Sequence, residues 1–176
     1  MESLYFLRGV NSGRNLADHL QRHYNNDMAT HPNKKSMLKE SLPEMILVAE
    51  YCVTFRKDPK VWGSGGCYGY PPAVLLLSIA DSIGSYILGG SVRNHFNILN
   101  NTKYYNLHLS ASSIGIIYKD YRCKLTHNTV MAPEIFLDIG TNNDDVFELQ
   151  DGKPYFNLTP FLEVSKQSIK YFLATL

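Results

Sequence analysis

Hydrophobic residues recur along this chain mostly at intervals of three and four, which is the spacing of amphipathic helices. The pattern predicts a polar, surface-type helix over residues 15–26 and then a polar loop. A second helix is predicted over 36–56, with Ser36 as its N-cap. Pro43 lies inside that helix and favours a kink, or a start near Ser41 instead. The first third of the chain is therefore expected to be helical.

The middle of the chain predicts the central helix of the fold. Residues 71–88 are apolar almost all round, so this helix is expected to be buried, and Gly89-Gly90 ends it. Two further helices are predicted over 91–99 and about 110–128, each opened by serine hydroxyls that can act as caps.

The pattern changes period late in the chain. Residues 135–139 and 146–149 are predicted to be extended, and Asp151-Gly152 is a hairpin turn signal. A last helix is predicted from Thr159-Pro160 to Leu176. The fold class that follows is mainly α: one domain over 1–176, a helical bundle of about five or six helices with a small antiparallel β-hairpin at about 135–157.

Composition narrows the class of protein. Hydrophobic residues make up 44% of the 176 and charged residues 19%, which is typical of a globular chain. The net charge of +1 counts against a high-affinity, non-specific nucleic-acid binder and leaves room for a local basic site. The 12 tyrosines and 8 phenylalanines favour a well-packed core, extended in one interpretation by an interface.

The cysteines and the apolar segments indicate in which cellular compartment the protein is expected. Cys52, Cys67 and Cys123 are odd in number and widely spaced, which argues against a disulfide framework or a zinc ribbon. The start lacks the architecture of a signal peptide, and the apolar run over 71–80 is far shorter than a membrane span. We expect a soluble cytoplasmic protein that needs no membrane, cofactor or metal.

The segment Tyr121-Arg-Cys-Lys-Leu-Thr-His-Asn128 carries the most suggestive chemistry. Arginine, four residues and then histidine at the end of an amphipathic helix resembles the motif of the HEPN superfamily. The resemblance implies a helical bundle, a homodimer and metal-independent cleavage of RNA, in a prokaryotic defence or toxin–antitoxin setting with a protein regulator. It assigns catalysis to Arg122 and His127. Family members often carry a polar residue where this chain has Cys123, and some members are non-catalytic.

Elementary chemistry supports these roles. Histidine can take or give a proton near neutrality, and arginine offers a fixed fork of donors to phosphate. Five residues on an ideal α-helix leave the two side chains about 140° apart, so they meet only through a kink or across a dimer axis. The expected supporting residues are Asp120 and Lys124, which share a face with His127, and Asn128.

Other interpretations of the same residues stay open. His127 could be a favourable charge at a helix end, and Arg122 an ordinary partner of a carboxylate. Asp81, inside the central helix, needs a partner and could pair with Arg93 or with Arg122. The whole chain could then be a non-catalytic helical module for dimerisation or protein binding.

A histidine pair, a glycine-rich loop and four tyrosines could also have a functional role, although a structural role is favoured for each. The spacing of His19 and His23 could hold a metal, although a third ligand is not evident and surface polar residues are favoured. The glycine-rich loop over 63–69 lacks the Gly-Lys-Ser/Thr of a nucleotide loop and is interpreted as a flexible connection. Four tyrosines could stack bases, and packing is favoured at the spacing of the last two; they are Tyr104, Tyr105, Tyr118 and Tyr121.

Overall fold

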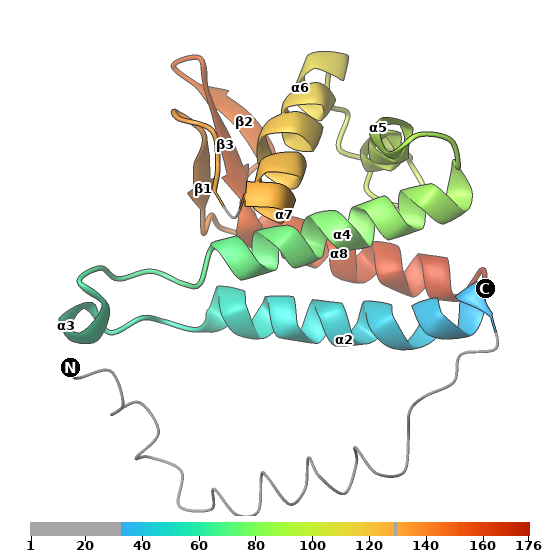
Figure 1. Cartoon of the computed structure of the whole chain (residues 1–176), viewed down its shortest axis with the longest axis horizontal. Helices are drawn as coiled ribbons and strands as arrows, with labels where there is room; N and C mark the ends of the chain where they lie inside the picture. The colour runs from blue at the N-terminus through green and yellow to red at the C-terminus, as the bar shows by residue number, and fades with distance from the viewer. Residues whose placement is uncertain (1–32, 129) are drawn as a thin grey trace, which may run out of the picture. The chain divides into compact units, whose positions relative to one another are not determined.

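The structure is a computed structural model that describes residues 33–128 and 130–176 (Figure 1). The helix predicted over 15–26 lies outside the described residues. The compact unit considered below runs from Leu38 to Leu176. In chain order the elements are α2 (Lys34–Thr54), α3 (Pro59–Trp62), α4 (Tyr70–Ile87), α5 (Val92–His95), the 3-10 helix η1 (Phe96–Asn100), α6 (Ala111–Ile116), the π-helix η2 (Ile117–Cys123), α7 (Lys124–Asn128), β1 (Phe136–Asp138), β2 (Phe147–Gln150), β3 (Lys153–Asn157) and α8 (Leu158–Leu173).

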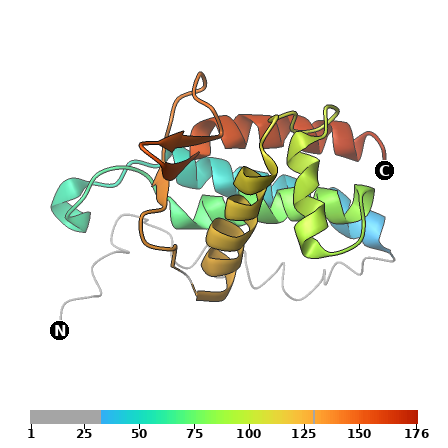
Figure 2. The same ribbon diagram turned by 90° about the horizontal axis from the view of Figure 1, so that it is seen from above.

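The mainly α fold class is confirmed, and α4 is the centre of the unit, as predicted. Its inward residues are almost completely buried, and it contacts α5, η1, η2, α7 and α8. Figures 1 and 2 show α2, α4 and α8 running side by side, with the segment from α6 to α7 crossing over α4. An ion pair of 2.7 Å between Glu50 Oε1 and Lys166 Nζ ties α2 to α8.

The start of α2 differs from the prediction. The side chain of Asn33, not Ser36, accepts hydrogen bonds from the backbone amides of Lys35 and Ser36, at 3.0 and 3.1 Å. Asparagine suits this position because its short side chain reaches the free amides of a first helical turn. Pro43 lies inside the helix, which continues unbroken through it.

The predicted helix over 110–128 exists as three consecutive pieces. Ser110 caps it as expected, accepting a hydrogen bond of 3.0 Å from the amide of Ser113. The piece from Ile117 to Cys123 is a π-helix, in which backbone hydrogen bonds run from residue i to i+5 instead of i+4. Of the five apolar positions expected to face inward, Ile114, Ile117, Tyr121 and Leu125 are buried, and Tyr118 is only partly buried.

The hairpin is also present, with a third strand beside it. β2 and β3 pair antiparallel through Asp151-Gly152, whose φ angles of 51° and 75° are those of the hairpin turn that Asp-Gly favours. β1 pairs with β3 in parallel, with Phe136 opposite Tyr155, so the expectation that all extended segments are antiparallel is wrong for β1. The sheet order is β1-β3-β2. A parallel neighbour is possible here because β2 and its flanking loops separate β1 from β3 in the sequence.

Among residues 33–128 and 130–176, no single helix has the length and apolar character of a membrane span. α4 together with the following segment Val92–Asn100 meets those criteria only as a pair bent by 99°.

Candidate functional site

The carboxylate of Asp81, on α4, contacts side chains from two other elements, η2 and α5. Its Oδ2 accepts a hydrogen bond of 2.9 Å from Nη2 of Arg122, on η2. Its Oδ1 lies 2.7 Å from Nδ1 of His95, at the end of α5. The side chains are 17% exposed for Asp81, 21% for Arg122 and 9% for His95. The prediction that Asp81 pairs with Arg93 or Arg122 is thus resolved in favour of Arg122.

His95 is the member of this cluster that sequence reasoning missed. Its Nε2 lies 3.2 Å from the carbonyl oxygen of Gly90, while Nδ1 faces Asp81. A carboxylate and a carbonyl oxygen both accept hydrogen bonds, so His95 satisfies both contacts only when each ring nitrogen carries a hydrogen. Asp81 thus bridges Arg122 and His95, and each of its two oxygens has a partner.

Glycines bring α5 close enough to α4 for this contact. A Cβ at Gly84 would lie 2.9 Å or less from backbone atoms of His95, so only glycine allows the two helices to approach in this way. Gly89 and Gly90 then adopt φ angles of 62° and 79° and reverse the chain. Ser91 caps α5, as predicted, through a hydrogen bond of 3.4 Å from the amide of Asn94.

The π-helix determines what lies beside Arg122. Residues five apart lie above one another in such a helix, which places Tyr118 next to Cys123. Cys123, beside the Tyr118 hydroxyl, raises the pKa of Tyr118. A π-helical turn often occurs at functional sites, because it changes the direction of side chains within a helix.

Tyr121, directly before Arg122, anchors the motif to the sheet. Its hydroxyl group lies 2.8 Å from the carbonyl oxygen of Phe136 and 2.9 Å from that of Pro154. Burial raises the pKa of this hydroxyl group, which keeps it neutral as a donor. The ring is fully buried, so Tyr121 has the packing role that its spacing favours rather than a stacking role.

The remaining predicted site residues lie apart from the Asp81 cluster. His127 is exposed in the last turn of α7 and has no ion pair or hydrogen bond through its side chain within the described part of the chain. Asp120 forms an ion pair of 3.6 Å with Lys124, as their spacing predicts, and none with His127. Asn128 ends α7, and its side chain lies outside the description.

The other features considered in the sequence are the histidine pair, the glycine-rich stretch and the tyrosines. His19 and His23 lie outside the described residues. Within 33–128 and 130–176, no three His, Cys, Asp or Glu side chains are grouped as metal ligands. Residues 58–70, expected to form a glycine-rich loop, contain the short helix α3, which Asp58 caps through a hydrogen bond of 2.9 Å from the amide of Lys60. Tyr104 and Tyr105 are buried, with Tyr105 packed against Phe161, which supports packing over base stacking.

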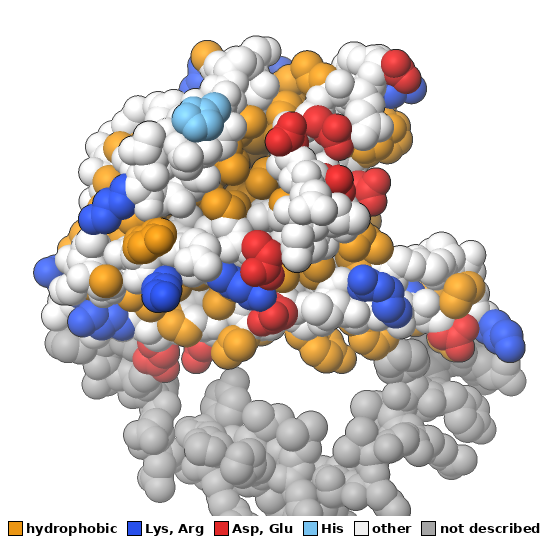
Figure 3. All heavy atoms as spheres, turned by 180° about the vertical axis from the view of Figure 1, so that it is seen from behind, with side chains coloured by type: hydrophobic (Ala, Val, Ile, Leu, Met, Phe, Trp, Pro, Cys, Tyr) orange, Lys and Arg blue, Asp and Glu red, His pale blue; other side chains and the backbone are white. Residues whose placement is uncertain are grey.

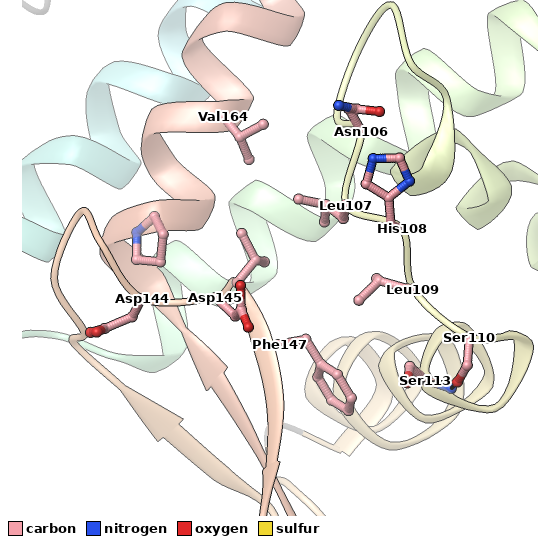
Figure 4. Close-up of a pocket in the computed structure, with 12 residues that line it drawn as sticks. Asn106, Leu107, His108, Leu109, Ser110, Ser113, Asp144, Asp145, Phe147 and Val164 are labelled. Carbon is pink, nitrogen blue, oxygen red and sulfur yellow. Dashed lines mark hydrogen bonds between the residues drawn. The ribbon is translucent and has the colours of Figure 1, made fainter.

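A pocket of about 540 Å³ opens between the loop before α6, β2 and α8 (Figure 4). Figure 4 shows Asp144 and Asp145 on the strand side, with His108 and Ser110 on the loop side. Figure 3 shows a hollowed face with apolar side chains on its floor, between acidic side chains and a histidine. Two carboxylates and no lysine or arginine line this pocket, so its charge repels phosphate.

Comparisons with known proteins do not assign a family or a function to this chain. No family model, no curated protein and no solved structure matches this chain.

Proposed function

We propose that this chain is a HEPN-like, metal-independent endoribonuclease that works as a homodimer. The observation that supports it most is the position of Arg122, which Asp81 holds at 2.9 Å while part of the side chain stays exposed. An exposed histidine, His127, follows five residues later on the same continuous helical segment. The resemblance of the motif extends the proposal to a defence or toxin–antitoxin setting with a protein regulator.

The proposed chemistry uses the 2′-hydroxyl of the RNA itself. That oxygen attacks the adjacent phosphorus, and the bond from phosphorus to the 5′-oxygen breaks. His127 acts as general base for the 2′-proton or as general acid for the leaving 5′-oxygen. The guanidinium of Arg122 binds the phosphate and stabilises the charge that develops on it, using donors other than the one given to Asp81. The products end in a 2′,3′-cyclic phosphate and a 5′-hydroxyl.

The geometry of the helix makes the dimer part of the proposal. Arg122 lies on the π-helix η2 and is held by Asp81, whereas His127 lies on α7 and is exposed outside the Asp81 cluster. We therefore place the Arg122 of one copy beside the His127 of a second copy, across a two-fold axis. Each dimer then has two composite sites.

Cleavage is tested with purified protein, mixed RNA and excess chelator. We expect the wild type to give fragments with 2′,3′-cyclic phosphate ends, and expect Arg122→Ala and His127→Ala to reduce cleavage by 100-fold or more, in the range of a lost acid–base group (about 10²–10⁴). The matched control is His108→Ala, which removes an exposed histidine from the acidic pocket. Identical RNA profiles for the wild type and His127→Ala would refute the proposal.

Mixing the two inactive variants tests the composite site. A heterodimer of Arg122→Ala with His127→Ala keeps one complete site when each site takes Arg122 from one copy and His127 from the other. After subunit exchange, half of the dimers are mixed, so activity should return to about a quarter of the wild-type value. No recovery in demonstrably mixed dimers would show that the two residues act within one chain.

The alternative is a non-catalytic helical module for dimerisation or protein binding. It is favoured by large apolar side chains that α2 exposes at helical spacing: Leu47 is 64% exposed, Val48 51% and Tyr51 63%. Light scattering separates the two functions. An interaction module would lose its oligomers in Leu47→Glu and show no cleavage, whereas a nuclease would lose cleavage in Arg122→Ala/His127→Ala and keep the wild-type mass.

A further inference from the structure

A groove lies along α6 and η2. It consists of two adjoining hollows of about 450 and 260 Å³, both of which are lined by Arg93 and Ala111. Lys119 and Tyr118 line the larger hollow from the π-helix, and Arg93 faces it from α5. The groove is thus bounded by the two segments that also supply Arg122 and His95 to the Asp81 cluster.

The groove carries unpaired positive charge. The side chains of Arg93 and Lys119 are exposed, and neither forms an ion pair or hydrogen bond with the residues that the structure describes. One acidic residue, Asp120, also lines the groove, and its carboxylate is already paired with Lys124. Two free cations facing one hollow suit a ligand with successive negative charges, and the fork of Arg93 suits a phosphate.

Tyr118 connects the groove to the Asp81 cluster. Its ring lines the groove and packs on Phe96 with 5.8 Å between ring centroids. Tyr118 and Arg122 both lie on η2, four residues apart. A ligand in the groove therefore reaches the neighbourhood of Arg122. The floor is open beside the tyrosine, because a Cβ at Gly115 would meet no atom within 4 Å.

We propose that this groove binds the sugar–phosphate backbone of single-stranded RNA next to the linkage held by Arg122. Arg93 and Lys119 each contact one phosphate, and the Tyr118 ring offers a surface on which a base can stack. The inference rests on the proposed nuclease function for the identity of its ligand. An acidic protein segment would suit the two cations but would make no use of an aromatic surface beside them.

Binding is tested without cleavage, using a fluorescein-labelled 12-nucleotide oligouridine whose 2′-oxygens are all methylated. Fluorescence anisotropy gives its Kd for the wild type and for Arg93→Ala/Lys119→Ala at several salt concentrations. We expect the double variant to bind at least 10-fold more weakly. The plot of log Kd against log salt should flatten by about 1.4, or about 0.7 for each lost phosphate contact. The matched control, Lys39→Ala/Lys170→Ala, removes the same charge from exposed positions elsewhere and should bind like the wild type.

Three outcomes would overturn the groove: equal Kd values for wild type and groove variant, an equal loss in the control, or preferential binding of polyglutamate that depends on Arg93 and Lys119. The experiments distinguish a wrong groove proposal from a wrong nuclease proposal. Cleavage that needs His127 but tolerates the groove variant refutes the groove alone. Groove-dependent binding without cleavage of ordinary RNA refutes the nuclease alone.

Discussion

The carboxylate of Asp81 and the guanidinium of Arg122 are 41 positions apart in the sequence and meet at 2.9 Å in the fold. The same carboxylate holds His95 at 2.7 Å through its other oxygen. Asp81 therefore fixes the direction of the arginine in the candidate motif and joins α4, α5 and η2 at one point. Arg122 does not need to find its orientation when a ligand arrives, which lowers the entropic cost of binding.

Asp81→Asn tests this relationship. The variant keeps the shape of the side chain and removes its charge, so Arg122 and His95 lose their charge-assisted hydrogen bonds in a partly buried place. We expect the free energy of unfolding to fall by about 2–3 kcal/mol, measured by urea denaturation. Asp120→Asn is the control, because it loses a surface-type pair with Lys124 and should cost less than about 1 kcal/mol. Equal losses in the two variants would contradict the role given to Asp81.

Gly84→Ala should separate α5 from α4. The new Cβ would overlap backbone atoms of His95, which cannot move without shifting α5 and its contact with Asp81. We expect a loss of at least about 2 kcal/mol, in the range of overpacked sites, with a lower Tm in calorimetry.

Gly115→Ala is the matched change in α6, where the added methyl group meets no neighbour within 4 Å. It should raise stability by about 0.5–1 kcal/mol, because alanine favours a helix over glycine. If Gly84→Ala were as stable as the wild type, the close approach of the two helices would not be required.

The sequence predicts local features of this fold well because their causes are local. A serine before a helix and Asp-Gly between two extended segments act within a few residues, and the structure has both Ser110 as a cap and the β2–β3 turn. The π-helix leaves no comparable signal, because tertiary packing determines whether a helix gains the extra residue in one turn. His95 was missed for the same reason: its partners, Asp81 and the Gly90 carbonyl, become visible only when α5 folds back on α4.

Tyr121→Phe tests the anchor between the motif and the sheet. It removes the hydroxyl that faces the carbonyl oxygens of Phe136 and Pro154, and so should lower the free energy of unfolding at pH 7 by about 1–2 kcal/mol. Tyr171→Phe, at a position 49% exposed on α8, should have almost no effect. Thermal unfolding of both variants at pH 7 measures the difference.

The pH dependence gives an independent check on Tyr121. Burial raises its pKa in the folded state above the ordinary tyrosine value of about 10. The unfolded chain therefore loses this proton first as the pH rises. The stability linked to the neutral hydroxyl is complete below about pH 9 and is lost progressively above about pH 10. Tyr121→Phe lacks this group, so its stability should decline less steeply between pH 9 and 11 than that of the wild type. Parallel declines would contradict the assignment.

Asn100 should control the loop that forms one wall of the acidic pocket. Its side-chain amide donates to the carbonyl oxygen of Leu109 and accepts from the amide of Leu109, both at 2.6 Å, as a neighbouring strand would. Between these residues, Asn106 and His108 adopt positive φ angles of 52° and 53°, which cost energy outside glycine. The two hydrogen bonds from Asn100 oppose this strain.

Asn100→Ala removes both of these hydrogen bonds. We expect the free energy of unfolding to fall by about 2 kcal/mol, or about 1 for each bond, together with faster hydrogen exchange at the Leu109 amide. Asn97→Ala, which loses one exposed hydrogen bond to Asn94, is the control and should leave that exchange rate unchanged. Unchanged exchange at Leu109 in Asn100→Ala would mean that the loop keeps its shape without the clamp.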